Sequence, residues 1–175
     1  MDAATQIEIR RAGPEDAPAI ATVLHESFVE FRALYTDGGF SATTPGTDQV
    51  LVRMQEGPGW VALREGTVLG TVAAVAKGDL IYIRGTAVLP DARGSGAGAR
   101  LLQQLEVWAG SQGCTRLFLS TTPFLNSAIR LYKRFGFHRT DEGMHDEGMH
   151  DLFGTPLFTM EKILGIPPPR ICLTR

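Results

Sequence analysis

The sequence has few cysteines, little net charge and no long hydrophobic run, and each absence narrows its interpretation. Its two cysteines, Cys114 and Cys172, form no motif, which argues against a disulfide framework and predicts reduced thiols in a cytoplasmic protein. The net charge of −2 predicts no nucleic-acid partner. No apolar run approaches a membrane span, and the first residues lack the charged and apolar regions of a signal peptide. We therefore expect no membrane partner.

What is present suits one globular domain, because 175 residues with 43% hydrophobic content can bury a sizeable core. Periodicity and turn residues predict the order strand, helices, three strands, helix, strand, helix and two closing strands. The strands and helices outside the glycine-rich region are expected at 6–11, 14–28, 31–35, 48–54, 60–63, 68–75, 80–88, 116–120, 127–135, from 137 onward and at 157–161. Gly38 and Gly39 are expected to break the second helical stretch. This order predicts a mixed α/β sheet with helices on both faces.

The segment 88–102 carries the strongest functional signal. Gly94, Gly96 and Gly98 alternate between a β-rich run that ends at Pro90 and an amphipathic helix that Gly113 should end. The first amides of a helix lack partners, and the helix dipole places partial positive charge there. Glycine lets a ligand approach the backbone closely. The segment therefore predicts a cradle for a phosphate or pyrophosphate.

The spacing excludes two common phosphate-binding loops. A P-loop needs Lys and Ser or Thr after its last glycine, but Ala99 and Arg100 follow Gly98. A dinucleotide fingerprint reads G-x-G-x-x-G with an acidic residue about 20 positions on, and residues 117–122 contain no carboxylate. A nucleotide-binding α/β protein is therefore disfavoured, while a glycine turn that only caps a helix stays an alternative.

Two motifs in order resemble the GNAT superfamily of N-acetyltransferases. Arg93, Gly96 and Gly98 match the pattern Arg/Gln-x-x-Gly-x-Gly/Ala, and residues 126–137 resemble the C-terminal signature of the family. The resemblance extends from about Ile7 to Lys162. It implies a mixed, mostly antiparallel sheet in which two central strands splay apart to admit pantetheine. It also implies acetyl-CoA as co-substrate and an amine of a small molecule or protein as acceptor.

The resemblance assigns site residues. The expected contacts to acetyl-CoA are Thr86, Ala87, Val88, Arg93, Gly94, Ser95, Gly96, Ala97, Gly98, Ala99 and Asn126. Tyr132 occupies the general-acid position, although a tyrosine that only packs its ring between helix and sheet is the alternative. The domain should span residues 1–164, followed by a proline-rich tail at 165–175. A homodimer is compatible with the family by analogy.

Two departures from the family pattern concern the chemistry. Leu125 stands where the family usually has asparagine, so Asn126 either contacts the cofactor or caps the helix. Ser120 stands where many relatives have a glutamate, and a serine cannot serve as the base. The weak candidates for a base are Tyr82, Asp79, His25, Glu26 and Glu30. The runner-up function is therefore an acyl-CoA-sensing module of the same fold without turnover.

A tandem repeat follows the second motif. Residues 141–145 recur as 146–150, with His145 and His150 five positions apart. On a strand this offset places the histidines on opposite faces, so we expect no metal site. A loop lengthened by local duplication is favoured, and its four carboxylates could attract a cationic amine.

Overall fold

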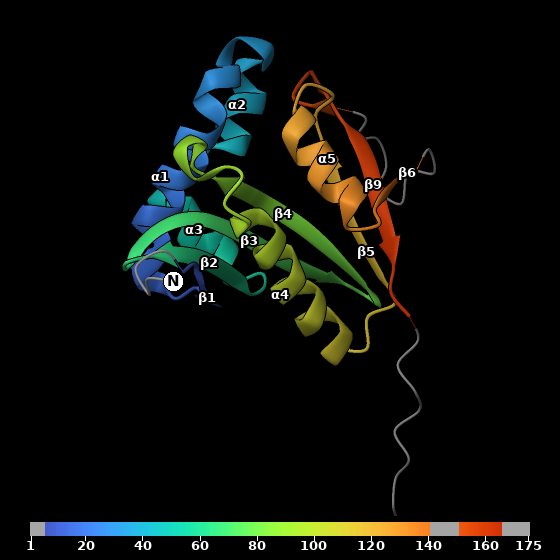
Figure 1. Cartoon of the computed structure of the whole chain (residues 1–175). Coiled ribbons are helices and arrows are strands. Elements are labelled where there is room, and N and C mark those ends of the chain that lie inside the picture. Colours follow the sequence, from blue (N-terminus) through green and yellow to red (C-terminus); the bar gives the residue numbers. More distant parts are fainter. Residues whose placement is uncertain (1–5, 141–150, 166–175) are drawn as a thin grey trace, which may run out of the picture.

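A seven-stranded sheet forms the centre of the computed structural model, which describes residues 6–140 and 151–165 (Figure 1). The strands are β1 (Glu8–Arg11), β2 (Gly59–Arg64), β3 (Thr67–Lys77), β4 (Leu80–Val88), β5 (Arg116–Thr121), β6 (His138–Thr140) and β9 (Phe158–Ile163). Their order is β1-β2-β3-β4-β5-β9-β6, and only β4 and β5 run parallel. The predicted mixed, mostly antiparallel sheet is confirmed.

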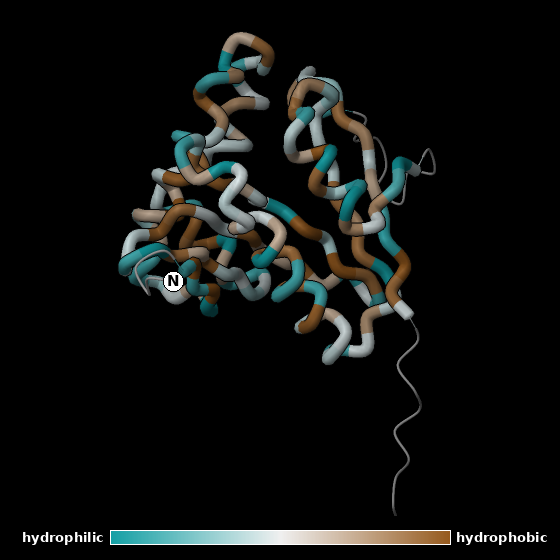
Figure 2. The backbone as a smooth tube through the Cα atoms, in the orientation of Figure 1, coloured by the Kyte–Doolittle hydropathy of each residue, from teal (hydrophilic) through white to brown (hydrophobic). Residues whose placement is uncertain are grey.

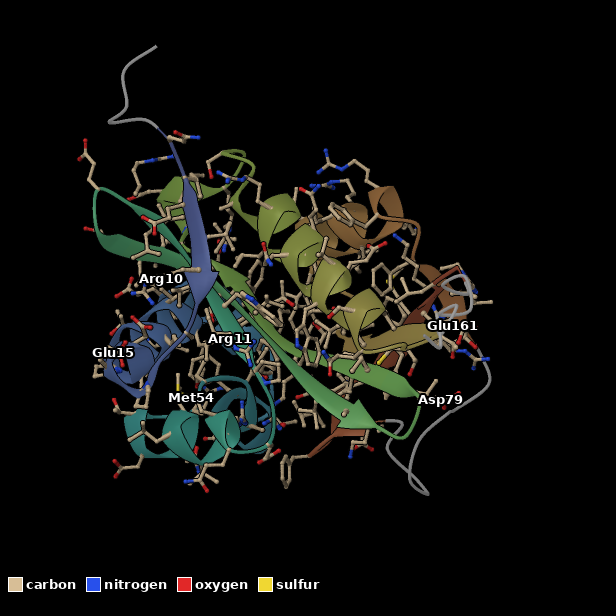
Figure 3. All side chains as sticks on the ribbon, turned by 90° about the horizontal axis from the view of Figure 1, so that it is seen from below. Arg10, Arg11, Glu15, Met54, Asp79 and Glu161 are labelled. Carbon is tan, nitrogen blue, oxygen red and sulfur yellow. The ribbon has the colours of Figure 1, made fainter. Side chains whose placement is uncertain are left out.

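Helices cover both faces of the sheet. They are α1 (Ala17–Phe28), α2 (Asp37–Thr43), α3 (Thr47–Met54), α4 (Ala97–Ser111) and α5 (Asn126–Arg134), with short 3-10 helices η2 (Pro14–Asp16), η3 (Val29–Leu34) and η4 (Pro90–Ala92). Seen from below, α1 and α3 lie on one side of the strands and α4 and α5 on the other (Figure 3). We refer to these two sides as the α1/α3 face and the α4/α5 face.

Each face has its own hydrophobic core, and both follow from helical periodicity. On the α4/α5 face, Leu101, Leu102 and Leu105 are at most 2% exposed. On the α1/α3 face, Val23 and Leu24 pack toward the sheet. Hydrophobic residues recur along the strands, whereas hydrophilic residues recur on the helices (Figure 2). Burial of these apolar stripes is the main force that fixes the layers.

The two parallel strands diverge in the middle of the sheet. Their ladder begins at Leu80–Arg116 and ends at Ile83–Leu119, although β4 continues to Val88. The two arms of the sheet separate beyond this point in Figure 1. Because β4 loses its β5 partner here, backbone groups at its edge are available to a ligand.

A β-bulge lies at the same place in β4. Thr71 pairs with Ala87 and Ala73 with Arg84, so Gly85 and Thr86 both stand opposite Val72. Gly85 has a φ of +61°, the left-handed conformation that such a bulge favours in glycine. Because of this extra residue, the side chains after the bulge point to the opposite faces from those that strict alternation would give.

One predicted break is wrong. Gly38 and Gly39 lie inside α2, because the Thr36 hydroxyl accepts a hydrogen bond from Gly39 N at 3.0 Å and caps the helix. A Cβ at Gly39 would stand 2.2 Å from Thr155 Oγ1, so glycine here serves close packing. The neighbouring two-stranded sheet of β7 (Asp151–Leu152) and β8 (Thr155–Pro156) is also absent from the sequence prediction.

Several expectations concern residues outside the described part of the chain. These are the repeat at 141–150, Cys172 and most of the tail. Within residues 6–140 and 151–165, no helix has the length and hydrophobicity of a membrane span. Within the same residues, no cluster of His, Cys, Asp and Glu has the composition of a metal site.

Candidate active site

The glycine loop is built as an open turn at the start of α4. Gly94 and Gly96 have φ values of +78° and +86°, and an added Cβ would meet no atom within 4 Å at either. The first bond of the helix runs from Arg100 N to Gly96 O at 3.0 Å. The amides of Ala97, Gly98 and Ala99 therefore have no acceptor within the helix, although Ser95 Oγ lies 3.4 Å from Ala97 N. The loop can bind an anion with backbone groups and the helix dipole.

Gly98 allows close packing of helices as well as close approach of a ligand to the backbone. A Cβ at this position would lie 2.9 Å from Leu131 Cδ2 and 3.7 Å from Val88 Cγ2. The first turn of α4 therefore lies close to both α5 and the end of β4, and a side chain at this position would displace the end of the Leu131 side chain. The sequence motif explains this glycine by ligand approach alone, and the structure adds the contact with α5.

The Arg93 side chain holds the loop against the end of α1. Its guanidinium donates to Ser27 O at 3.1 Å and pairs with Glu30 Oε1 at 2.5 Å. The Ser27 hydroxyl in turn donates to Val88 O at 3.0 Å. These bonds connect the glycine loop, α1 and the end of β4. They also engage Glu30, one of the candidate bases.

Tyr132 joins α5 to the diverging strand β4. Its side chain is 6% exposed, and its phenol interacts with the Thr86 side chain. Burial raises the pKa of the phenol, which the Thr86 contact lowers in part. Its ring lies 6.0 Å from that of Phe137. The side chain is thus both packed and polar, and it keeps its proton at neutral pH.

The other residues of the predicted site lie nearby in the fold. Ala87 is 5% exposed and packs on the α1/α3 face, whereas Val88 packs on the α4/α5 face. Asn126 is the exposed first residue of α5, and Leu125 is the N-cap, with no capping bond from its side chain. The interpretation of Asn126 as a cap is therefore wrong. The structure leaves its predicted contact with the cofactor untested.

The remaining candidate bases are dispersed. Asp79 lies in the turn before β4, where Thr115 Oγ1 approaches its carboxylate at 3.4 Å, at the opposite end of the strand from the bulge (Figure 3). His25 is exposed and contacts the edge of Phe40 at 6.0 Å between ring centroids. Tyr82 belongs to β4, and burial raises the pKa of its phenol. No carboxylate among these candidates stands beside Tyr132.

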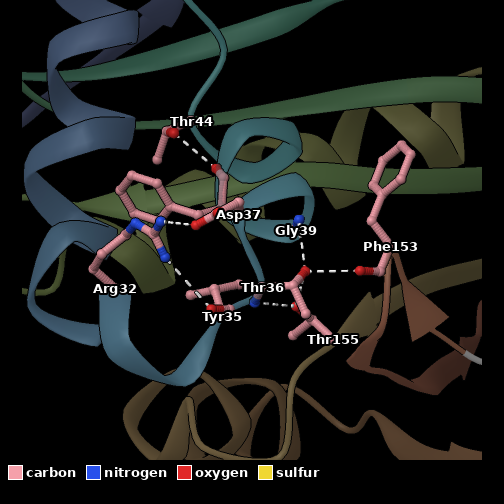
Figure 4. A network of polar contacts seen from close by, with 9 residues as sticks. Arg32, Tyr35, Thr36, Asp37, Gly39, Thr44, Phe153 and Thr155 are labelled. Carbon is pink, nitrogen blue, oxygen red and sulfur yellow. Dashed lines mark hydrogen bonds and ion pairs between the residues drawn. The ribbon is translucent and has the colours of Figure 1, made fainter.

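A polar clasp connects the two arms of the molecule (Figure 4). Thr36 N donates to Thr155 Oγ1 at 3.0 Å, and the Thr36 hydroxyl donates to Phe153 O at 2.8 Å. The two hydroxyls lie 3.1 Å apart, and Thr155 is 1% exposed. Thr36 thus caps α2 and at the same time binds to the β7–β8 hairpin. The partners are 119 residues apart, and no local pattern in the sequence indicates this clasp.

An aromatic bridge lies near the clasp. The ring of Tyr35 meets Phe124 edge-on at 4.9 Å, and Phe31 lies 6.1 Å from Phe124. Phe31 belongs to η3 and Phe124 to the connection between β5 and α5. The clasp and this bridge thus connect the two diverging arms through polar and aromatic contacts.

Comparison with known proteins decides the family. The model of the acetyltransferase (GNAT) family matches residues 21–137. An Escherichia coli (strain K12) protein named uncharacterized N-acetyltransferase YjgM is 33% identical over 140 residues, which cover 76% of this chain and 83% of that protein. The chain belongs to the GNAT family. This membership makes it an acetyltransferase with acetyl-CoA as co-substrate, as the glycine loop predicts.

Other members of the family give the same fold. The structure resembles the PaiA N-acetyltransferase of Thermoplasma acidophilum, solved in complex with coenzyme A, with a TM-score of 0.74 at 20% identity. That match covers 91% of this chain and 99% of the other. A GNAT acetyltransferase from Staphylococcus aureus Mu50 matches with a TM-score of 0.75 at 14% identity, over 91% of this chain and 100% of the other.

Proposed function

We propose that this GNAT protein transfers the acetyl group of acetyl-CoA directly to a primary amine, and that Tyr132 is the general acid. The observation that carries the proposal is the buried Tyr132 phenol, which interacts with Thr86 beyond the point where β4 leaves its partner strand. A bound thioester at this edge would place its sulfur near a side chain that can donate a proton.

The donor is expected to lie on the α4/α5 face. The amides of the loop 94–99 bind the pyrophosphate, and the Arg93 contacts keep this loop in place. Backbone groups of Thr86, Ala87 and Val88 pair with the pantetheine arm as an added strand would. Asn126, exposed at the start of α5, is a further contact to the cofactor.

The reaction proceeds by direct attack. The nitrogen lone pair of the amine attacks the thioester carbon, an amide C–N bond forms, and the C–S bond breaks with its electrons on sulfur. Tyr132 gives its phenolic proton to the thiolate, and water returns a proton to the tyrosinate. A phenol and a thiol ionise within about two pKa units of each other, so this exchange is energetically accessible. The amine loses its proton to water.

Thiol release tests the proposal. The purified protein is mixed with acetyl-CoA and a panel of amines, and free CoA thiol and acetylated amine are both quantified. We expect equimolar thiol and product only when a suitable amine is present. Tight binding of acetyl-CoA without turnover by any amine would instead support the sensing module.

A further inference from the structure

The α1/α3 face of β4 carries an arginine at the point where the strands diverge. Arg84 is the first residue after the last β4–β5 pair and directly precedes the bulge at Gly85. Its guanidinium pairs with Glu56 at 2.9 Å and donates to Arg53 O at 3.3 Å. Its Nε is buried without a hydrogen-bond partner. A buried donor without an acceptor is costly, so this nitrogen indicates a missing partner.

A second arginine stands next to it. Arg53, on α3, donates to Ala42 O at 2.9 Å. Burial lowers its pKa, and the charge of Arg84 lowers it further. Across residues 6–140 and 151–165, Arg53 forms no ion pair, so Glu56 is the carboxylate that this pair of arginines shares. The cluster therefore holds one more positive charge than negative.

Both arginines line a small cavity. It has a volume of about 50 Å³, and its wall includes Thr71, Gly85 and apolar side chains of α1 and α3. The apolar members are Ile20, Leu24, Val50 and Met54. The space suits one small polar group, such as a carboxylate, beside a short hydrocarbon chain. The walls come from α1, α3, β2, β3, β4 and the loops beside them, and for this reason no motif in the sequence indicates the cavity.

We propose that Arg84, assisted by Arg53, binds the carboxylate of the acceptor, and that the acceptor is a small amino acid-like amine. A guanidinium binds a carboxylate through two parallel hydrogen bonds, and the free Nε supplies one donor. Arg84 lies two residues before Thr86, about 6–7 Å along the strand. The two residues are therefore close enough for one small acceptor to place its carboxylate at the Arg84 guanidinium and its amine at the thioester beyond the bulge.

This inference rests on the proposed function and makes it specific. A protein N-terminus or lysine has no free carboxylate at that spacing, so the arginines favour a small molecule over a protein as acceptor. Glu56 competes with the acceptor carboxylate for Arg84, because it already pairs with that guanidinium. Its removal should strengthen acceptor binding, whereas removal of Arg84 should weaken it.

The test compares free amino acids with their carboxamides. Free L-amino acids and β-alanine, each beside its carboxamide, are offered with acetyl-CoA, and kcat/KM is obtained from thiol release. We expect the best free acid to exceed its amide by about 10- to 100-fold, the usual range for hydrogen bonds to a charged group. Arg84→Gln should reduce this preference to near unity, and Glu56→Gln should lower the KM of the acid severalfold.

Arg64→Gln is the matched control. Arg64 ends β2 and does not line the cavity, although its Nε is also buried without a partner. This variant should therefore keep the preference for the acid. If Arg84→Gln does not fold, the opposite effect of Glu56→Gln still tests the site. Equal kcat/KM for acids and amides in the wild type would overturn this inference and leave the proposed function standing. Absence of thiol release with every amine would overturn both.

Discussion

The two faces of β4 near the bulge differ in how the sequence encodes them. On the α4/α5 face, Thr86 meets Tyr132, and the contiguous loop 94–99 supplies amides for a phosphate. On the α1/α3 face, Arg84 contacts Arg53 of α3 and Glu56, which are far away in the sequence. The donor side therefore depends on local motifs shared by the family. The proposed acceptor side depends on tertiary contacts between distant segments.

The largest effect is expected from Tyr132→Phe, which changes only the α4/α5 face. Loss of the phenolic proton donor should lower kcat about 100-fold or more, while the KM for acetyl-CoA changes little. Because the pKa of Tyr132 is raised above its usual value near 10, the acid stays protonated and its ionisation should not reduce kcat below that pH. Steady-state thiol release across the pH range measures both effects.

Tyr35→Phe is the control for this variant. It removes the hydroxyl of another buried tyrosine but keeps the ring against Phe124. We expect kcat near the wild-type value. An unchanged kcat in Tyr132→Phe would contradict the assignment of the acid and would favour a packing role for this side chain.

Gly96→Val tests the donor side through its loop. A side chain at a φ of +86° strains the backbone by about 1–2 kcal/mol and fills the open turn, so the Kd for CoA should rise about tenfold or more. Gly66→Val is matched, because Gly66 has a φ of +76° and equally open surroundings in the turn between β2 and β3. Titration calorimetry with CoA should show a loss in the first variant only. A loss of equal size in both would indicate a general effect of strain.

Thr155→Val tests the clasp on the acceptor side. It leaves the Thr36 amide without its acceptor, which should lower the free energy of unfolding by about 1–3 kcal/mol. The KM of the acceptor should rise severalfold, while the Kd for CoA stays constant, because the hairpin lies away from the glycine loop. Thr44→Val removes a hydroxyl that bonds only within its own segment, to Phe40 O at 2.7 Å, and should change neither constant. A weaker affinity for CoA in Thr155→Val would argue against separate faces.

The smallest effect is expected from the ion pair behind the glycine loop. Both side chains are partly exposed, so the Arg93–Glu30 pair should contribute less than about 1 kcal/mol. If Arg93 acts by positioning the loop, Glu30→Gln should raise the Kd for CoA by a small factor, and Arg93→Gln by somewhat more, because it also removes the bond to Ser27 O. A loss of affinity of about 100-fold in Arg93→Gln would indicate instead that the guanidinium binds a phosphate directly.

The sequence predicted most elements because their signals are local. Strand alternation, the apolar stripe around Leu101 and the left-handed Gly113 after α4 all depend on near neighbours. The prediction failed at Gly38 and Gly39, where the helix accepts glycine in order to fit Thr155 from a distant hairpin. The same limit applies to the site. The loop and Tyr132 belong to motifs, whereas the pairing of Arg53 with Arg84 depends on how α3 packs on the sheet.

The most direct test of the account is a crystal structure of the protein with CoA bound. We predict the pyrophosphate on the amides of residues 94–99 and the pantetheine along the free edge of β4. The CoA sulfur should lie within hydrogen-bond distance of Tyr132 Oη, on the face of β4 opposite Arg84. A sulfur placed away from Tyr132, or CoA bound on the α1/α3 face, would contradict the division of the site between the two faces.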